Sequence, residues 1–261
     1  IELKNKLENI SVYARVSPEN KIRIVKAWQE REKITAMTGD GVNDAPALKQ
    51  ADIGIGMGSG TDVAKDAASM ILVDDNFATI VKAVEIGRAV FSNIKKSITY
   101  LFAGNLGAII SILFAVFVNL PNPFTAIQLL FINLINDSLP AIALGLEPPE
   151  KNIMNDKPRN INDGILSDGI GRIVILRGVI IGVVTIIAQY IGLKVSSELG
   201  TAMAFSTILL ARIFQTIAAR SDYYTSIELG FFSNKYVFGA MGITFIIYLL
   251  ILLPGVRSIL S

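Results

Sequence analysis

Long apolar runs fill most of the chain after Ile98, and they constrain its fold more than any other feature. The runs cover Ile98–Val118, Pro123–Leu144, Ile173–Leu193, Leu199–Ala219 and Tyr236–Leu253. About 20 apolar residues of helix are needed to cross the ~30 Å hydrocarbon core of a bilayer. Buried helices of a large soluble protein would not give so many such runs in succession. We therefore expect an integral, multi-pass α-helical transmembrane domain over residues 98–261, with about five spans in the lipid bilayer.

The charges between these runs predict an orientation in the membrane. Residues 119–122 carry no charge, whereas Lys95 and Lys96 precede the first run and Lys151 and Arg172 lie between the second and third. Connecting segments that are rich in Lys and Arg stay on the cytoplasmic side. Lys194 is an exception, on the opposite side. We expect residues 1–97 to be cytoplasmic.

Composition excludes several classes of function. The net charge is only +2, and no basic stripe with interleaved aromatic residues occurs, so nucleic-acid binding has no support. The chain has no cysteine and no histidine. Within this stretch that excludes disulfides, histidine metal sites and Ser-His or Cys-His nucleophiles.

Residues 1–97 are charged and mixed, and they alternate between strand and helix patterns. A parallel sheet with helices on both faces is the usual outcome of such alternation. Ser17 can cap a helix that begins at Pro18, since proline suits the first helical position. We expect strands at 12–16, 34–37, 51–57 and 70–74, helices at 45–50 and 61–69, and a long helix from residue 76 towards the membrane. The fold class is thus an α/β parallel-sheet partial domain followed by a transmembrane bundle.

The stretch "TGDGVND" concentrates polar groups directly after the second expected strand. It contains Thr38, Gly39, Asp40, Asn43 and Asp44. Ligands of open α/β sheets bind at the carboxyl ends of parallel strands. Carboxylate oxygens suit a hard cation such as Mg²⁺, and the nearby Lys21 can reach a phosphate, so phosphoryl transfer fits this set. The alternative is a solvated turn, and "GMGSGTDVA" is expected to be only a turn because it lacks the phosphate-loop lysine pattern.

Three segments together resemble the P-type cation ATPases. These are "ARVSPENK" at 14–21, "MTGDGVNDAPALKQADIGIGMGSGTDVAKDAASMILVDDNF" at 37–77, and "NLINDSLPAIALGLEPPE" at 133–150, which is similar to the calcium-pumping branch of the sarcoplasmic reticulum type. The resemblance continues through the apolar runs to the end of the chain.

The resemblance implies a haloacid-dehalogenase-like phosphorylation domain in which an aspartate of a D-K-T-G-T motif takes the γ-phosphate of ATP. Asp40 would bind Mg²⁺, Asn43 and Asp44 would organise the site, Lys21 would contact the phosphoryl group, and Thr38 with Gly39 would shape the loop. No D-K-T-G occurs in these residues. We expect the carboxyl-terminal portion of a pump, with residues 1–97 completing the phosphorylation domain and its linking helix. Its partners would be the nucleotide-binding and actuator domains and the first four spans.

Polar residues inside the second run suggest an ion site. Asn133, Asn136 and Asp137 lie on one face of a helix, and polar groups at this depth are functional by default. Pro140 has no amide hydrogen, so the carbonyl of Asn136 loses its helical donor and can bind a cation. Interhelical hydrogen bonding by the asparagines is the alternative.

The resemblance extends to this ion site, with departures. It implies that Asn105, Asn133 and Asp137 are Ca²⁺ ligands. Where two-site calcium pumps carry glutamates, this chain has Ala108 in the first run and Arg212 in the fourth, and Asn136 replaces a threonine. Losing two carboxylates and gaining a guanidinium predicts one Ca²⁺ per ATP, with Arg212 as a tethered cation beside Asp137. The alternative is that Arg212 merely extends to the membrane interface.

The sequence therefore predicts ATP-driven export of Ca²⁺ from the cytoplasm, with a bacterial plasma membrane as the expected location. A Mn²⁺ or monovalent-cation pump is the alternative within the class. A passive channel, a regulatory membrane fragment and a membrane-anchored phosphatase are alternatives from other classes. A chain without phosphorylation chemistry would have no evident need for Asp40, Asn43, Asp44 and Lys21.

Overall fold

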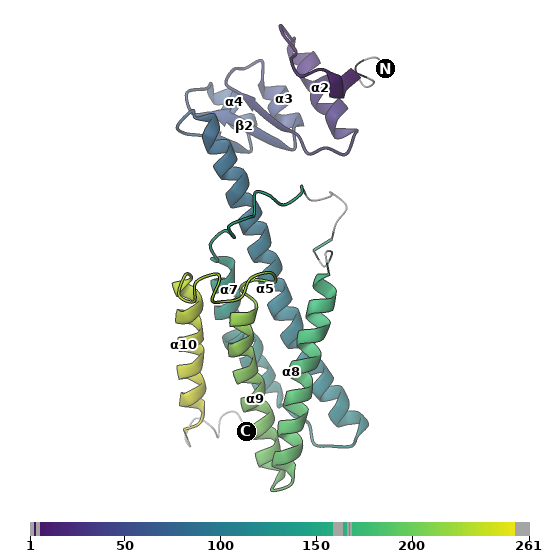
Figure 1. Cartoon of the computed structure of the whole chain (residues 1–261), viewed down its shortest axis with the longest axis vertical. Coiled ribbons are helices and arrows are strands. Elements are labelled where there is room, and N and C mark those ends of the chain that lie inside the picture. The colour runs from purple at the N-terminus through teal and green to yellow at the C-terminus, as the bar shows by residue number, and fades with distance from the viewer. Residues whose placement is uncertain (1–2, 4–5, 159–163, 166, 168, 254–261) are drawn as a thin grey trace. The chain divides into compact units, whose positions relative to one another are not determined.

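The computed structural model describes residues 3, 6–158, 164–165, 167 and 169–253 (Figure 1). They fall into two units: a sheet unit, Ile1–Glu85 with Lys157–Asn162, and a helical unit, Ile86–Asp156 with Asp163–Ser261.

The sheet unit is built on three parallel strands in the order β1-β2-β3. Strands β1 (Ala36–Gly39), β2 (Ile53–Met57) and β3 (Met70–Leu72) are separated by helices α3 (Ala45–Gln50) and α4 (Asp62–Ala67). Helix α3 packs on β1 and β2, α4 packs on β2, and α2 (Pro18–Gln29) packs on α3. A short 3-10 helix, η1 (Leu7–Asn9), precedes them. The expected α/β parallel architecture is confirmed.

Three details of the sheet unit differ from expectation. The expected strand at 12–16 is wrong: these residues form no strand, and Val12 is 79% exposed. A strand needs a neighbour to pair with its backbone, and β1 pairs only with β2 in the described part of the chain. The second strand, expected at 34–37, is shifted by two residues: β1 runs from Ala36 to Gly39. Ser17 does precede α2, but its hydroxyl accepts a hydrogen bond from the Asn20 amide rather than from the backbone.

The helical unit contains the apolar runs. Its elements are α5 (Phe77–Phe117), which begins in the sheet unit, then α6 (Ala126–Phe131), the π-helical turn η2 (Ile132–Asn136), α7 (Ser138–Gly145), α8 (Ile170–Leu193), α9 (Ser197–Ala218) and α10 (Lys235–Ile251). Within the described ranges, four helical stretches are long and apolar enough to cross a membrane: α5, 126–145, α8 and α9. The fifth expected span corresponds to α10, which is apolar but has 17 residues.

Side-chain caps explain where several of these helices begin. Thr125 and Gln128 form a reciprocal capping box at the start of α6. Ser196 caps α9 by accepting from the Leu199 amide, and Asn234 caps α10 by accepting from two backbone amides. Polar caps of this kind set the first residue of α6, α9 and α10.

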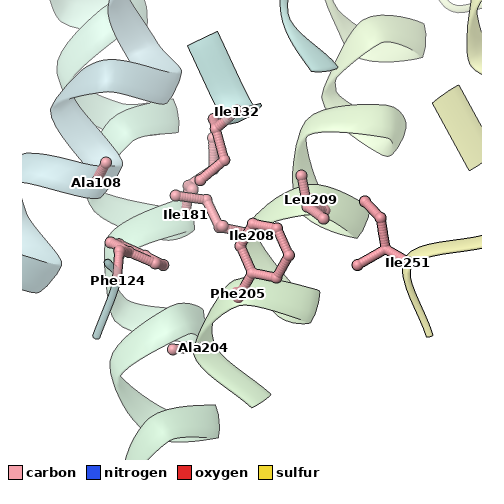
Figure 2. Close-up of a cluster of buried hydrophobic side chains, with 9 residues drawn as sticks. All are labelled: Ala108, Phe124, Ile132, Ile181, Ala204, Phe205, Ile208, Leu209 and Ile251. Atoms are coloured by element: carbon pink, nitrogen blue, oxygen red, sulfur yellow. The ribbon is translucent and has the colours of Figure 1, made fainter. Parts of the chain in front are cut away.

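An apolar cluster fills the interior of the helical unit (Figure 2). Ile132, Ile181 and Ile208 come from the second, third and fourth runs, and they meet near Phe124 and Ala108. Other large apolar side chains of the same helices, such as Leu176 and Val116, are more than half exposed. Hydrocarbon-facing helices expose apolar side chains in this way.

Candidate phosphate hinge and ion site

The stretch 38–44, called the hinge below, begins in β1 and continues as a turn. The Asp44 carboxylate holds this turn. Thr38 and Gly39 are the last residues of β1, and Asp44 is the residue that precedes α3. A Cβ on Gly39 would lie 2.4 Å from the Asp44 Cβ, so only glycine fits there. The Asp44 Oδ2 accepts from the Gly41 amide at 3.4 Å, which closes the turn.

Lys21 from α2 forms an ion pair with the Asp44 Oδ1. Burial alone would raise the pKa of the Asp44 carboxyl. The Lys21 ammonium and the Gly41 amide outweigh this effect, and the pKa of Asp44 lies below its ordinary value. The Asp44 carboxylate is therefore charged at neutral pH, and Lys21 is held beside the turn that follows β1.

Asp40 and Asn43 have exposed side chains, unlike Asp44. The Asp40 carbonyl accepts from the Thr61 amide at 2.8 Å, which ties the hinge to the turn before α4. That turn, at 58–61, is the middle of the glycine-rich stretch 56–64, which starts in β2 and ends in α4. An exposed carboxylate is an oxygen donor that suits Mg²⁺. Among the described residues no group of three or more acidic side chains could hold a metal, so the donors here would fill only part of a coordination shell.

In the helical unit, Asp137 and Arg212 form a buried ion pair. Their side chains are 1% and 0% exposed. The Arg212 Nε donates to the Asp137 Oδ1 at 2.8 Å, and the Nη2 lies 2.6 Å from the Oδ2. Arg212 lies in α9, and Asp137 sits between η2 and α7. The guanidinium thus turns inward and does not extend to the membrane interface.

Other groups complete the environment of the guanidinium. The Arg212 Nη1 donates to the Tyr100 carbonyl at 2.6 Å and to the Gln215 Oε1 at 2.7 Å. The guanidinium carbon lies 3.9 Å from the centroid of the Tyr100 ring, a cation–π distance. A Cβ on Gly104 would lie 1.8 Å from the Nη1. The guanidinium can therefore take this position only because α5 has a glycine there.

The π-helical turn places the acidic residue. The Asp137 amide donates to the Ile132 carbonyl at 3.0 Å, a bond across five residues. Such turns break the regular helical ladder and are frequent at functional sites. The Asn136 side chain is 1% exposed, and its amide lies 3.4 Å from the Asp137 Oδ1. The second apolar run is therefore interrupted at 132–136, ahead of Pro140, which lies inside α7.

The structure gathers only part of the predicted ion-site set. Asn136, Asp137 and Arg212 lie together, whereas Ala108 lies in the apolar cluster. Asn105 and Asn133 have exposed side chains in this chain. Sequence reasoning missed Gln215, Tyr100 and Gly104. Only Gln215 had a signal, since it lies three residues after Arg212 on the same helical face.

A parallel α/β unit with a charged turn after its first strand, joined by α5 to apolar helices that bury a carboxylate–guanidinium pair, defines a class of protein: multi-pass membrane proteins that carry an α/β domain. Residues 121–261 match the family described as cation transporting ATPase, C-terminus, and residues 21–84 match the haloacid dehalogenase-like hydrolases. The chain belongs to the cation-transporting ATPases, and it is an integral, multi-pass membrane protein.

Curated relatives agree with this family. The chain is 67% identical over 260 residues to a calcium-transporting ATPase of Listeria monocytogenes and 63% identical over 260 residues to calcium-transporting ATPase 1 of Lactococcus lactis. Each alignment covers 100% of this chain and 30% of the relative. A calcium-transporting ATPase of Bacillus subtilis is 49% identical over 92% of this chain and 27% of its own length. The chain therefore spans about 30% of the length of the first two relatives.

Proposed function

We propose that this chain is the part of an ATP-driven calcium pump that holds the phosphate hinge and half of the ion site. The buried Asp137–Arg212 pair carries the proposal. A carboxylate and a guanidinium inside membrane helices are costly and mark ion pathways. Two relatives named calcium-transporting ATPases, aligned over the full chain, support Ca²⁺ as the ion.

At the hinge, the proposal assigns roles to this chain's residues. Asp40 would hold Mg²⁺, which supplies charge neutralisation for phosphoryl transfer when it is bound. Lys21 would contact the phosphoryl group, and Asn43 and Asp44 would organise the turn that Thr38 and Gly39 shape. The aspartate that receives the phosphate from ATP would lie outside these residues. Helix α5 is continuous from Phe77 to Phe117, and it would transmit the change at the hinge to the ion site.

At the ion site, we propose one Ca²⁺ per ATP. Arg212 would act as a tethered cation that satisfies Asp137 on the side facing α9. Asn105, Asn133 and Asp137 would bind the transported ion together with ligands outside these residues. Ala108 provides no ligand, and Asn136 offers an amide where a hydroxyl is expected. The carbonyl of Asn136, freed by Pro140, would add an uncharged oxygen ligand.

The test is a titration of free Ca²⁺ in vesicles that contain the full-length pump. Acid-stable phosphoenzyme formed from ATP is measured, with Mn²⁺ and Na⁺ in parallel. A single site predicts phosphoenzyme only with Ca²⁺, along a non-cooperative curve. A steep cooperative curve would show that a second site survives despite Ala108 and Arg212.

The Arg212→Ala variant tests the tethered cation in the same vesicles. Removing the guanidinium leaves Asp137 buried without its counter-charge, so we expect changed transport stoichiometry or pH dependence. Unchanged stoichiometry and pH dependence would contradict the role of Arg212. Phosphoenzyme that depends on Mn²⁺ alone would favour the manganese pump, and no phosphoenzyme with any cation would favour a non-catalytic membrane protein.

A further inference from the structure

A second buried ion pair joins the same two segments that carry Asp137 and Arg212. Glu147 follows the end of α7, and Arg220 follows the end of α9. Their side chains are 2% and 0% exposed. The Arg220 Nε and Nη2 both donate to the Glu147 Oε1, at 3.0 Å and 2.7 Å. In both pairs the carboxylate belongs to the α7 segment and the guanidinium to the α9 segment.

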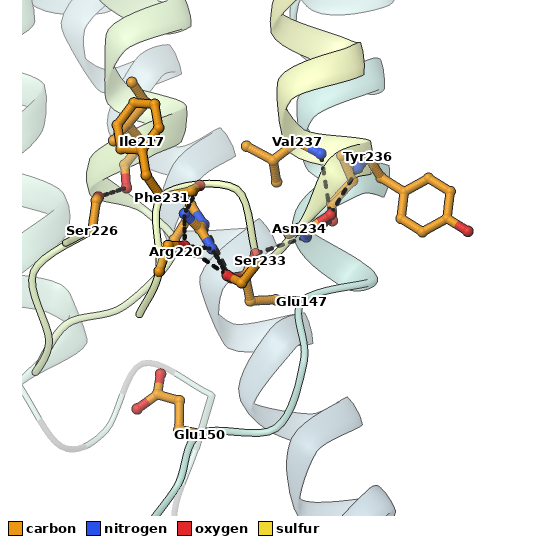
Figure 3. A network of polar contacts seen from close by, with 12 residues as sticks. Glu147, Glu150, Ile217, Arg220, Ser226, Phe231, Ser233, Asn234, Tyr236 and Val237 are labelled. Carbon is orange, nitrogen blue, oxygen red and sulfur yellow. Dashed lines mark hydrogen bonds and ion pairs between the residues drawn. The ribbon is translucent and has the colours of Figure 1, made fainter. Parts of the chain in front are cut away.

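The Glu147–Arg220 pair is closely enclosed by hydrogen-bond partners (Figure 3). Arg220 Nη1 also donates to the Phe231 carbonyl at 2.9 Å, and its Nη2 donates to the Ser233 hydroxyl at 2.5 Å. The second oxygen of Glu147 accepts from the Asn234 amide at 2.7 Å. A buried ion pair is stable only when its other donors and acceptors are satisfied in this way.

The spacing of the two pairs fixes how the segments can move. Asp137 and Glu147 are ten residues apart on one segment (137 to 147), and Arg212 and Arg220 are eight apart on the other (212 to 220). At about 1.5 Å per helical residue, the pairs lie roughly 12–15 Å apart along the segments. Two directional contacts at this separation oppose both sliding and rotation of α7 against α9.

We propose that Glu147 and Arg220 are positioning residues for the ion site, which hold Asp137 in register with Arg212. This inference rests on the proposed function of Asp137 and Arg212. Neither Glu147 nor Arg220 would touch the transported ion. They act through the Asp137–Arg212 contact, because a shift of α7 along α9 would separate these side chains as well. The alternative is that the Glu147–Arg220 pair only anchors the start of α10, through the contact of Glu147 with Asn234.

The first test measures the apparent Ca²⁺ affinity of phosphoenzyme formation in the full-length pump. Glu147→Gln and Arg220→Gln each leave one buried charge without its partner, so the segments should shift. We expect each variant to need about tenfold more Ca²⁺ for half-maximal phosphoenzyme, with the maximal level within about twofold of the unmodified pump.

Arg177→Gln is the matched control. Arg177 in α8 also reaches the end of α9, where its Nη2 donates to the Ala218 carbonyl at 3.0 Å and to Asp222 at 3.1 Å. Its ion pair is partly exposed, and exposed pairs contribute little. We expect apparent affinity within about twofold of the unmodified pump. An equal loss in Arg177→Gln and Arg220→Gln would show a general loosening of α9 and would overturn the proposal.

The second test asks whether Arg220 acts through Arg212. Arg220→Gln is combined with Arg212→Ala, and the Ca²⁺ titration and its pH profile are repeated. If Arg220 only keeps Arg212 in register, the double variant should match Arg212→Ala alone. Effects that multiply would show that Arg220 acts independently, which would also overturn the proposal.

Two precautions keep the result decisive. If Arg220→Gln does not accumulate in membranes, Arg220→Lys replaces it. Lysine keeps the charge but loses the second contact with Glu147, and we expect about a threefold loss of apparent affinity, whereas no loss would count against the proposal. If the pump responds to Mn²⁺ rather than Ca²⁺, the calcium assignment fails, and the same comparison with Mn²⁺ still tests the positioning role.

Discussion

At the scale of single residues, Arg212 can be buried because position 104 is a glycine and has no side chain. The guanidinium occupies the space that a Cβ of Gly104 would need, with an ideal Cβ only 1.8 Å from the Nη1 and 1.9 Å from the Cζ. Four groups hold the guanidinium there: Asp137, the Tyr100 carbonyl, the Tyr100 ring and Gln215. A glycine in a membrane helix is in this case part of the site.

Gly104→Ala should therefore displace the guanidinium from Asp137. In a helix, alanine is favoured over glycine by about 1 kcal/mol, but overpacking at this position should cost about 1–3 kcal/mol. We expect a lower midpoint of thermal unfolding and a change in the pH dependence of the Ca²⁺ titration like that of Arg212→Ala. Thermal unfolding and phosphoenzyme titration of the full-length pump measure both.

The control for this prediction is Gly242→Ala in α10. A Cβ on Gly242 would meet nothing within 4 Å, so its effect reports the helix preference for alanine alone. Equal stability and equal Ca²⁺ dependence in the two variants would mean that Arg212 does not need the space beside Gly104.

Part of the candidate ion site was predictable from the sequence, because some of its residues are close together along the chain. Asn136 and Asp137 lie in one short stretch, and the family resemblance linked Arg212 to them. The Tyr100 and Gly104 contacts are different, because they join α5 to α9 across more than 100 residues of chain. Helical periodicity shows which face a residue shares with its neighbours, but not which distant helix lies opposite that face.

At the scale of elements, the same distinction explains the fold. The helix at 45–50 and the apolar runs were predicted well, because turn residues, caps and periodicity act within a few residues. The strand expected at 12–16 did not form, because pairing depends on a partner elsewhere in the chain. The break in the second span was expected from Pro140 alone, and its form as a π-helical turn before the proline was not.

The interrupted helix gives a prediction of its own. Pro140→Ala supplies an amide hydrogen to the carbonyl of Asn136, which would then serve as a helical acceptor rather than as an ion ligand. We expect weaker apparent Ca²⁺ affinity in the phosphoenzyme titration. The thermal stability should stay equal or rise, by at most about 3 kcal/mol, because alanine is the better helix residue.

The prediction is specific because Pro140→Ala should weaken the apparent Ca²⁺ affinity without lowering the thermal stability. Pro148→Ala provides the comparison, since Pro148 is exposed and lies beyond the end of α7. It should leave the apparent affinity unchanged. Reduced stability of Pro140→Ala with unchanged affinity would mean that the proline serves packing and has no part in the ion site.

At the scale of the whole molecule, the proposed function requires the hinge and the ion site to be coupled although they lie in different units. Helix α5 is the covalent link, because its 41 residues begin at Phe77 in the sheet unit and end at Phe117 in the helical unit. A continuous helix transmits displacement along its axis because no flexible joint interrupts it. For this coupling to drive export, residues 1–97 must face the cytoplasm, where ATP is available.

Membrane topology tests that requirement, and the lack of cysteine in this chain makes the experiment clean. Asn122→Cys and Lys151→Cys place single thiols at exposed positions on either side of the second span, Ala126–Gly145. That span has 20 residues, about 30 Å of helix, which matches the hydrocarbon core. In a full-length pump without other cysteines, a membrane-impermeant thiol reagent should label Lys151→Cys only from the cytoplasmic side and Asn122→Cys only from the opposite side. Labelling of both from one side would mean that 126–145 does not cross the bilayer, and the buried Asp137–Arg212 pair would then not be a transmembrane ion site.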